Sequence, residues 1–259
     1  MCALPASALP EATHLSRMQV WGGNCNVERN LHVTGIVGWV FSRAFPPGTC
    51  GGDVYYLSVC DQDVMYRVVL ADVAGHGADF NAPAQKLEDL IAEHINVHDQ
   101  SELMRDLNAD ILRDNGKYAT AVVLGYQRQT GTLFFTTAGH PPVLWYRAAT
   151  GIWDFLHEET EHALTHEGLP IGLIADTAYT QTAVQLGPGD MLVLYTDGFA
   201  EATDPQGNEL GYTGIKALAA GIAIHSPHIF GMELLSAIQE FCGRADFDDD
   251  RTLMVLRRA

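Results

Sequence analysis

The chain has 259 residues, of which 32 are acidic and 15 basic, giving a formal net charge of −17. Hydrophobic residues make up 47%, enough to bury a sizeable core, which excludes a disordered chain. The negative charge argues against nucleic acid or a membrane surface as the main partner, because both attract basic proteins, and no apolar run is long enough to span a membrane. A phosphorylated substrate would therefore need a cation beside it.

Residues 1–25 are predicted to form a short N-terminal leader, and residues 26–259 a single domain. The leader has no basic segment and is interrupted by Pro5 and Pro10, so it does not resemble a secretory signal. The five cysteines include no Cys-x-x-Cys pair, which argues against a thiolate zinc site. We therefore expect reduced thiols and a cytoplasmic location.

Strand and helix patterns follow one another in blocks. Runs of β-branched and aromatic residues with turn residues between them predict strands, and apolar residues at intervals of three and four predict helices. The expected strands are 31–41, 54–60, 64–71, 119–126, 132–137, 143–147, 191–196 and 252–256. The expected helices are 78–94, one opened by Ser101 as its N-cap, 214–222, and one opened by Ser226 with Pro227 at its first position. Because helices follow sets of strands in pairs, we expect an α+β layered domain with sheets inside and helices outside.

Four aspartates stand at the ends of predicted strands or in the turns beside them: Asp53, Asp72, Asp197 and Asp249. A carboxylate in this position can project from a point that the sheet fixes. Several of them at one edge would repel one another unless a cation lay between them, and oxygen ligands suit Mg²⁺ or Mn²⁺ better than zinc. Each aspartate alone is equally typical of a turn, and the run at 248–250 is typical of a solvated loop. Spacing alone leaves both interpretations open.

Other motifs fail on spacing or context. His157 and His162 are five residues apart, whereas a His-Glu-x-x-His zinc site needs four, so 157–167 is interpreted as a surface flap. His98-Asp99 lacks the further histidines of a metal phosphohydrolase, which favours helix capping. The residues after Asp53 are not the acidic-aromatic pair of a diguanylate cyclase. The sequence also contains neither a P-loop nor a Gly-x-Ser-x-Gly motif.

Eight short motifs remain, in one order, within residues 30–257. They are 51–53 (GGD), 71–77 (ADVAGHG), 119–121 (ATA), 138–142 (AGHPP), 168–172 (GLPIG), 188–190 (PGD), 195–202 (YTDGFAEA) and 249–252 (DDRT). Each is weak alone, but the ordered set is specific. Together they resemble the metal-dependent protein phosphatase (PPM) family, in its bacterial SpoIIE/RsbU-like branch. The resemblance implies a four-layer α-β-β-α sandwich of two antiparallel sheets flanked by helix pairs.

The resemblance also implies a chemistry: hydrolysis of phosphoserine or phosphothreonine by a water activated between two Mn²⁺ or Mg²⁺ ions. Carried over by motif, Asp72 would bridge the two cations and the backbone carbonyl of Val73 would complete the site of one. Asp197 and Asp249 would hold the second cation. Asp53 would bind directly or through water. Two divalent cations would balance the four carboxylates, which meets the need for a cation noted above.

Three positions depart from the family pattern. Tyr56 stands where the family often has an aspartate three residues after Asp53. Thr49 stands where many eukaryotic relatives have an arginine that clamps the phosphoryl group, so Arg43 is either a substitute clamp or an ordinary surface arginine. His76 lies four residues after Asp72, which favours a loop role, and no general acid is assigned.

The branch further implies a role in bacterial partner-switching signalling. Its substrates are often phosphorylated anti-sigma factor antagonists of the STAS fold, so we expect a phosphorylated protein partner in the cytoplasm. Two alternatives stay open: a catalytically silent module of the same fold that binds phosphoproteins, and a phosphomonoesterase that acts on small molecules.

Overall fold

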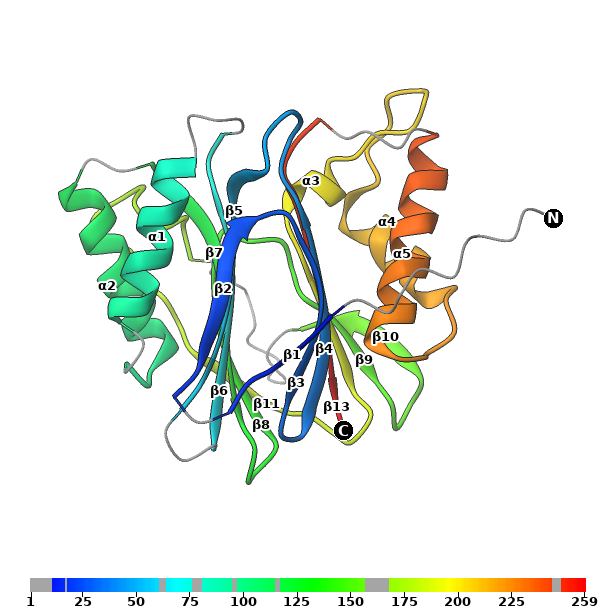
Figure 1. Ribbon diagram of the computed structural model, residues 1–259, viewed down its shortest axis with the longest axis horizontal. Helices are drawn as coiled ribbons and strands as arrows, with labels where there is room; N and C mark the ends of the chain where they lie inside the picture. Colours follow the sequence, from blue (N-terminus) through cyan, green and yellow to red (C-terminus); the bar gives the residue numbers. More distant parts are fainter. Residues whose placement is uncertain are drawn as a thin grey trace.

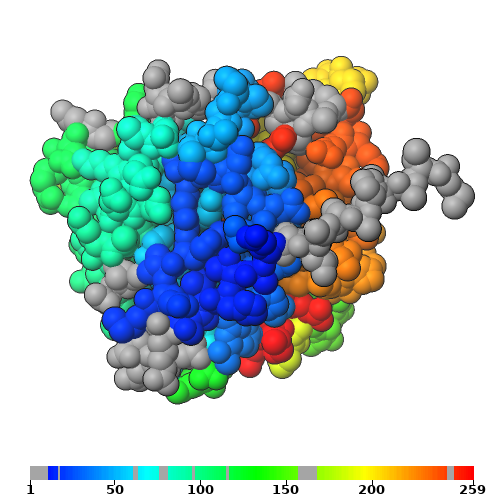
Figure 2. Space-filling model, viewed as in Figure 1, coloured from blue at the N-terminus to red at the C-terminus, as the bar shows by residue number. Residues whose placement is uncertain are grey.

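The computed structural model describes residues 11–16, 18–60, 64–75, 81–94, 97–114, 117–156, 168–243 and 248–259. Two β-sheets pack face to face, and helices cover both outer faces (Figure 1). The predicted four-layer α-β-β-α sandwich is thereby confirmed. In the space-filling view of the same side, the first strands lie between the two helical layers (Figure 2).

The first sheet has six antiparallel strands in the order β11-β8-β7-β6-β5-β2. Their bounds are β2 (Val20–Cys25), β5 (Cys50–Val59), β6 (Met65–Val73), β7 (Ala119–Gln127), β8 (Thr132–Ala138) and β11 (Thr182–Gln185). Side chains alternate along β5: Tyr55 and Leu57 enter the core between the sheets, whereas Val54 and Tyr56 face the helices. β5, β6 and β7 are buried on both faces, so these three strands appear in the sequence as nearly continuous apolar runs.

The second sheet has seven strands in the order β1-β3-β4-β13-β12-β9-β10. Their bounds are β1 (Ala12–His14), β3 (Val27–Val33), β4 (Ile36–Arg43), β9 (Leu144–Arg147), β10 (Ile152–Phe155), β12 (Met191–Tyr195) and β13 (Arg251–Arg258). The edge strand β1 runs parallel to β3, and the other pairs are antiparallel. The single strand predicted over 31–41 is wrong: the chain turns at Gly35, with φ of +87°, and forms the β3–β4 hairpin. The predicted boundary at residue 26 stays a prediction, although β1 and β2 already lie in the sheets.

Helices α1 (Asn81–Glu93) and α2 (Gln100–Arg113) pack on the six-stranded sheet, and α4 (Gly211–Ala220) and α5 (Pro227–Cys242) on the seven-stranded one (Figure 1). The short helix α3 (Asp197–Ala200) follows β12. Ser226 caps α5 as predicted, since its side chain accepts a hydrogen bond from the Ile229 N–H. The N-cap of α2 is Asp99 rather than Ser101, because the Asp99 carboxylate accepts from the backbone N–H groups of the next turn. No helix of the described ranges is long and apolar enough to cross a membrane.

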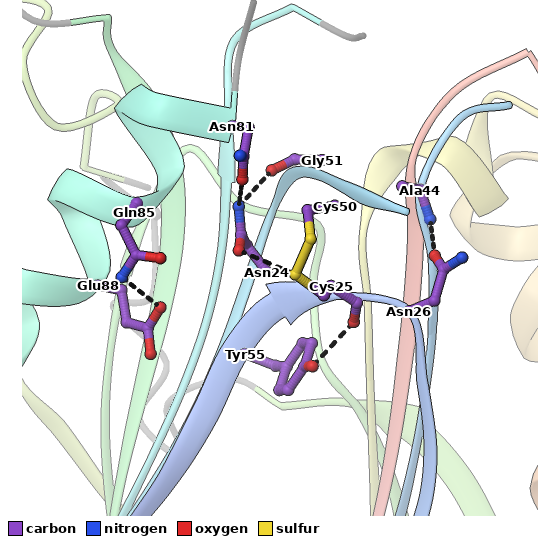
Figure 3. Close-up of a disulfide and its surroundings, with 10 residues drawn as sticks. All are labelled: Asn24, Cys25, Asn26, Ala44, Cys50, Gly51, Tyr55, Asn81, Gln85 and Glu88. Atoms are coloured by element: carbon purple, nitrogen blue, oxygen red, sulfur yellow. Dashed lines mark hydrogen bonds between the residues drawn. A yellow bond between two sulfur atoms is a disulfide. The ribbon is translucent and has the colours of Figure 1, made fainter. Parts of the chain in front are cut away.

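The expectation of reduced thiols is wrong at one pair of cysteines. Cys25 ends β2 and Cys50 begins β5; the two residues are cross-strand partners and form a disulfide (Figure 3). They are 25 positions apart in the sequence, so spacing alone gave no sign that they meet. Cys60 and Cys242 lie outside this disulfide.

Candidate metal centre

At one end of the sandwich, the apolar core between the sheets gives way to polar side chains. In the six-stranded sheet, the register places Asp53 of β5 opposite Asp72 of β6, and Asp72 opposite Thr120 of β7. Directly paired residues share a face of the sheet, and Asp53 lies on the face of Tyr55, which belongs to the core between the sheets. The two aspartates and the threonine therefore form a polar row that faces the other sheet.

Hydroxyl groups of the seven-stranded sheet face this polar row. Ser42 of β4 and Thr252 of β13 are cross-strand partners, and Thr196 follows β12 beside Thr252. The hydroxyls of Thr196 and Thr252 donate hydrogen bonds to Asp53 Oδ2, at 2.9 and 2.7 Å. Thr252 Oγ1 also lies 2.9 Å from Ser42 Oγ. Asp53 is thus fixed by hydrogen bonds that cross from one sheet to the other.

The second carboxylate oxygen of Asp53 has no such support. Asp53 is 2% exposed, and its Oδ1 atom has no hydrogen-bond partner among the described residues. Burial raises the pKa of Asp53 well above its usual value, and the charges of Asp250 and Asp197 raise it further, although the two threonine hydroxyls oppose the shift. A buried carboxylate oxygen without a donor is a position that a cation would satisfy.

Asp72 links the predicted site residues to one another. Burial raises its pKa first, and the nearby carboxylates of Asp53, Asp197 and Asp249 raise it further. Asp197, one of these neighbours, is the first residue of α3. The structure therefore brings all four predicted aspartates to one edge of the sandwich: Asp53 and Asp72 lie within strands, Asp197 begins α3 after β12, and Asp249 precedes β13.

The donor set fits a hard divalent cation. It consists of carboxylate oxygens; burial first, and then neighbouring carboxylates, raise the pKa values of Asp53 and Asp72, and one Asp53 oxygen is buried without a partner among the described residues. In the described part of the chain, no three His, Cys, Asp or Glu side chains already form a metal-binding group. Metal ligation by Asp53, Asp72, Val73, Asp197 and Asp249 therefore stays a prediction.

Asp250 is a supporting residue to which the sequence patterns gave no role. It is 3% exposed, and its two oxygens accept hydrogen bonds from the backbone N–H groups of Phe45 and Gly52, both at 2.6 Å. A Cβ atom at Gly51 would overlap with the Asp250 carboxylate, so a larger residue there would force that carboxylate to shift. Asp250 thereby holds the start of β5 against the start of β13. Its place in a run of three aspartates, typical of a solvated loop, concealed this.

A buried histidine extends the polar row beyond β7. His140 Nδ1 lies 3.1 Å from Thr120 Oγ1, and Thr120 is the cross-strand partner of Asp72. Burial lowers the pKa of His140 to about 3, so the imidazole is neutral at physiological pH. The motif at 138–142 located this histidine, but only the β7 register connects it to the aspartates.

Two of the residues discussed as departures from the family pattern, Arg43 and Tyr56, have defined surroundings in the structure. Arg43 is engaged by its own sheet: its Nη1 atom donates to the carbonyls of Val27 and Ser42, both at 2.8 Å, and its guanidinium lies over the ring of Phe41. Tyr56 belongs to the core beneath α1 and α2, on the opposite face of β5 from Asp53. His76 and the predicted flap at 157–167 lie outside the described residues.

Sequence comparison matches the chain to a family described as Stage II sporulation protein E (SpoIIE), over residues 62–259. The phosphoserine phosphatase RsbP of Bacillus subtilis (strain 168) is 28% identical over 159 residues, which are 59% of this chain and 37% of RsbP. The phosphoserine phosphatase RsbU of the same organism is 26% identical over 223 residues, 82% of this chain and 61% of RsbU. The chain thus covers 61% or less of the length of these two relatives.

Solved structures share the fold. The PP2C phosphatase domain of SpoIIE from Bacillus subtilis, solved with a fragment of its regulatory domain, has a TM-score of 0.68 and 19% identity, covering 94% of this chain and 64% of that one. RsbX, solved in complex with magnesium, has a TM-score of 0.65 and 14% identity, covering 90% of this chain and 100% of that one. The match over residues 62–259 is three quarters of the sequence, and with it the family is established: this chain belongs to the SpoIIE family and has the fold of PP2C phosphatase domains.

Proposed function

We propose that this chain is a metal-dependent phosphatase that hydrolyses phosphoserine and phosphothreonine in a protein substrate. The observation that carries the proposal is the convergence of Asp53, Asp72, Asp197 and Asp249 at one edge, with Asp53 Oδ1 buried and lacking a donor among the described residues. Membership of the SpoIIE family and the similarity to two phosphoserine phosphatases support it.

The ligands would come from both sheets. We assign Asp53, Asp72, the backbone carbonyl of Val73, Asp197 and Asp249 to two Mn²⁺ or Mg²⁺ ions. The magnesium in the RsbX structure supports a hard divalent cation in this fold. When bound, such a pair supplies an acidified water and offsets charge on the phosphoryl group. The protein's own part is positioning: the hydroxyls of Thr196 and Thr252 orient Asp53 so that its other oxygen points to the site.

The substrate is proposed to be a phosphorylated protein in the cytoplasm, in a partner-switching pathway, with a STAS-domain anti-sigma factor antagonist as the specific candidate. A protein of net charge −17 needs cations to hold a phosphoryl group, which favours substrate capture at the metal centre itself. Arg43 would take no part, because it is bonded to carbonyls of β3 and β4.

Release of phosphate from a phosphoserine peptide, measured with and without Mn²⁺, tests the proposal. Asp72→Asn should lower the rate at least about 100-fold, more than the loss of a residue that merely supports a ligand. Asp89→Asn, at an exposed aspartate of α1, is the matched control and should leave the rate unchanged. Equal turnover by Asp72→Asn and the unmodified protein would reject the site. Phosphopeptide binding without release would favour the silent module, and faster turnover of p-nitrophenyl phosphate than of the peptide would favour a small-molecule esterase.

A further inference from the structure

The Cys25–Cys50 disulfide lies at the end of the sheet that carries the aspartates. Cys50 begins β5 and is followed directly by Gly51, Gly52 and Asp53. The pairing of β2 with β5 is irregular between Gly23 and Cys25, so the cysteines form an isolated last pair beyond the irregularity. Both cysteines are partly exposed, so a small molecule in solution can reach them.

The residues beside Cys25 connect this end of β2 to its surroundings (Figure 3). The Asn24 side-chain amide donates to the Gly51 carbonyl at 3.0 Å and to Asn81 Oδ1 at 2.7 Å. Asn81 is the first residue of α1. Asn24 is 4% exposed, so its bond to the Gly51 carbonyl is buried, whereas its bond to Asn81 is partly buried. One side chain thus joins the strand that leads to Asp53 to the helix that covers the sheet.

Hydrogen bonds carry the connection from the disulfide to the candidate metal centre. The Tyr55 hydroxyl donates to the Cys25 carbonyl at 2.8 Å, and the Asn26 N–H donates to the Thr49 carbonyl at 2.7 Å. One residue beyond Gly51, the Gly52 N–H donates to Asp250. A movement of the Cys25 end of β2 would therefore act on the backbone that positions Asp53.

We propose that Cys25 and Cys50 form a redox modification site that exchanges with low-molecular-weight thiols, and that the disulfide form holds the start of β5 in the arrangement that binds metal. In reduction, a small thiolate attacks one sulfur and expels the other cysteine as a thiolate, and a second thiol resolves the mixed disulfide. Two electrons and two protons pass to the cysteines, and the small thiols leave as their own disulfide. Oxidised glutathione reverses the reaction.

Reduction of the disulfide is expected to weaken metal binding, because the Cys25–Cys50 pair lies apart from the regular β2–β5 pairing. Without the covalent bond, the pair beyond the irregularity is held by the backbone bond from Asn26 to Thr49 and by side-chain bonds, so we expect the end of β2 to fray more readily. Fraying loosens the Asn24 bonds to Gly51 and Asn81, and with them the backbone before Asp53. The reduced protein should bind Mn²⁺ about tenfold more weakly, at the lower end of the range for residues that support a ligand. For this effect on metal binding, the inference rests on the proposed function.

Alkylation and hydrogen exchange test the site without any metal. After equilibration with oxidised glutathione, Cys25 and Cys50 should resist alkylation until dithiothreitol is added. Reduction should speed amide exchange at 24–26, 49–53 and 81–84 and leave α5 unchanged. Alkylation of both cysteines in the oxidised protein, or identical exchange in the two states, would overturn the inference.

Mn²⁺ titration of the oxidised and reduced proteins, desalted under anaerobic conditions, tests the coupling. The Cys25→Ser/Cys50→Ser double variant should match the reduced protein in both redox conditions, whereas Cys60→Ser, the control outside the disulfide, should keep the full response. Equal Mn²⁺ affinity of the oxidised and reduced proteins would overturn the coupling. Absence of Mn²⁺ binding in both states would instead reject the proposed metal centre, and hydrogen exchange would then decide the redox inference alone.

Discussion

The two sheets bring different chemistry to the same end of the sandwich. The six-stranded sheet places Asp53 and Asp72 side by side within its strands, where burial and the charges of neighbouring carboxylates raise their pKa values. The seven-stranded sheet faces them with hydroxyls, two of which donate to Asp53. Hydroxyl donors stabilise one oxygen without neutralising the carboxylate, so the charge stays available to a cation. The comparison indicates that the six-stranded sheet holds two carboxylates within its strands, whereas the seven-stranded sheet orients one of them through hydroxyls and carries Asp197 and Asp249 next to the ends of β12 and β13.

Removing the charge of an aspartate in the six-stranded sheet should have the largest effect on Mn²⁺ binding. Asp53→Asn should weaken Mn²⁺ binding at least about 100-fold, beyond the range for supporting residues, yet raise the Tm of the metal-free protein by a few degrees, because a buried charge is removed. Calorimetric titration and thermal unfolding check the two effects.

The stability gain should depend on pH with a defined sign. Because the folded state raises the pKa of Asp53, its ionisation costs stability as the pH rises. The advantage of Asp53→Asn should be complete above the raised pKa and vanish below about pH 4, the ordinary aspartate range, where Asp53 is protonated in both states. A gain that persisted unchanged at pH 3 would show that charge is not its cause.

Removing an orienting group from the seven-stranded sheet should have a smaller effect. Thr252→Val keeps the shape but loses the hydroxyl, so we expect about 10- to 100-fold weaker Mn²⁺ binding and recovery in Thr252→Ser. Thr136→Val is the matched control, because the buried Thr136 hydroxyl has no hydrogen-bond partner among the described residues. Equal Mn²⁺ affinity of Thr252→Val and the unmodified protein would show that the Thr252 hydroxyl does not contribute to metal binding.

A substitution at the start of β5, where the backbone packs against Asp250, should mainly lower the stability of the protein. Gly51→Ala brings a methyl group into the Asp250 carboxylate and should lower the free energy of unfolding by about 1–3 kcal/mol. Gly221→Ala, where a Cβ atom meets only ordinary contacts of 3.4 Å or more, should be close to neutral. Urea unfolding compares them, and equal stability of the two variants would contradict the close packing of β5 on Asp250.

The smallest effect is expected at Arg43. Its guanidinium is bonded to the carbonyls of Val27 and Ser42 and lies 3.8 Å from Glu28. Arg43→Ala should therefore change the KM for a phosphoserine peptide by no more than about twofold, since exposed ion pairs contribute little. A tenfold rise in KM at unchanged kcat would instead assign Arg43 to the phosphoryl group.

The sequence predicted the elements whose pattern is local. Strands β5, β6, β7, β12 and β13 are buried on both faces and form long apolar runs, and α5 has its cap and its proline in adjacent positions. The β3–β4 hairpin was missed because only Thr34 and Gly35 interrupt a run rich in valine and isoleucine. A turn of two residues is easily lost in such a run.

The residues of the candidate site also fall into those that a local sequence pattern predicts and those that it does not. The four aspartates could be predicted because each stands at the end of an apolar strand pattern or in the turn beside one, and Asp53 and Asp197 are next to glycine. The contribution of Thr196 and Thr252 depends on which strands of the two sheets face each other, and the disulfide depends on the β2–β5 register. Neither relation is local in the sequence, and both need the folded arrangement.

The central claim is that carboxylates from both sheets share divalent cations. Crystals of the protein soaked in Mn²⁺ and measured at the manganese absorption edge test it most directly. We predict two anomalous peaks about 3.5–4 Å apart, in contact with Asp72 and with carboxylates from both sheets. The absence of anomalous peaks near these aspartates, or manganese bound only elsewhere on the protein surface, would contradict the account.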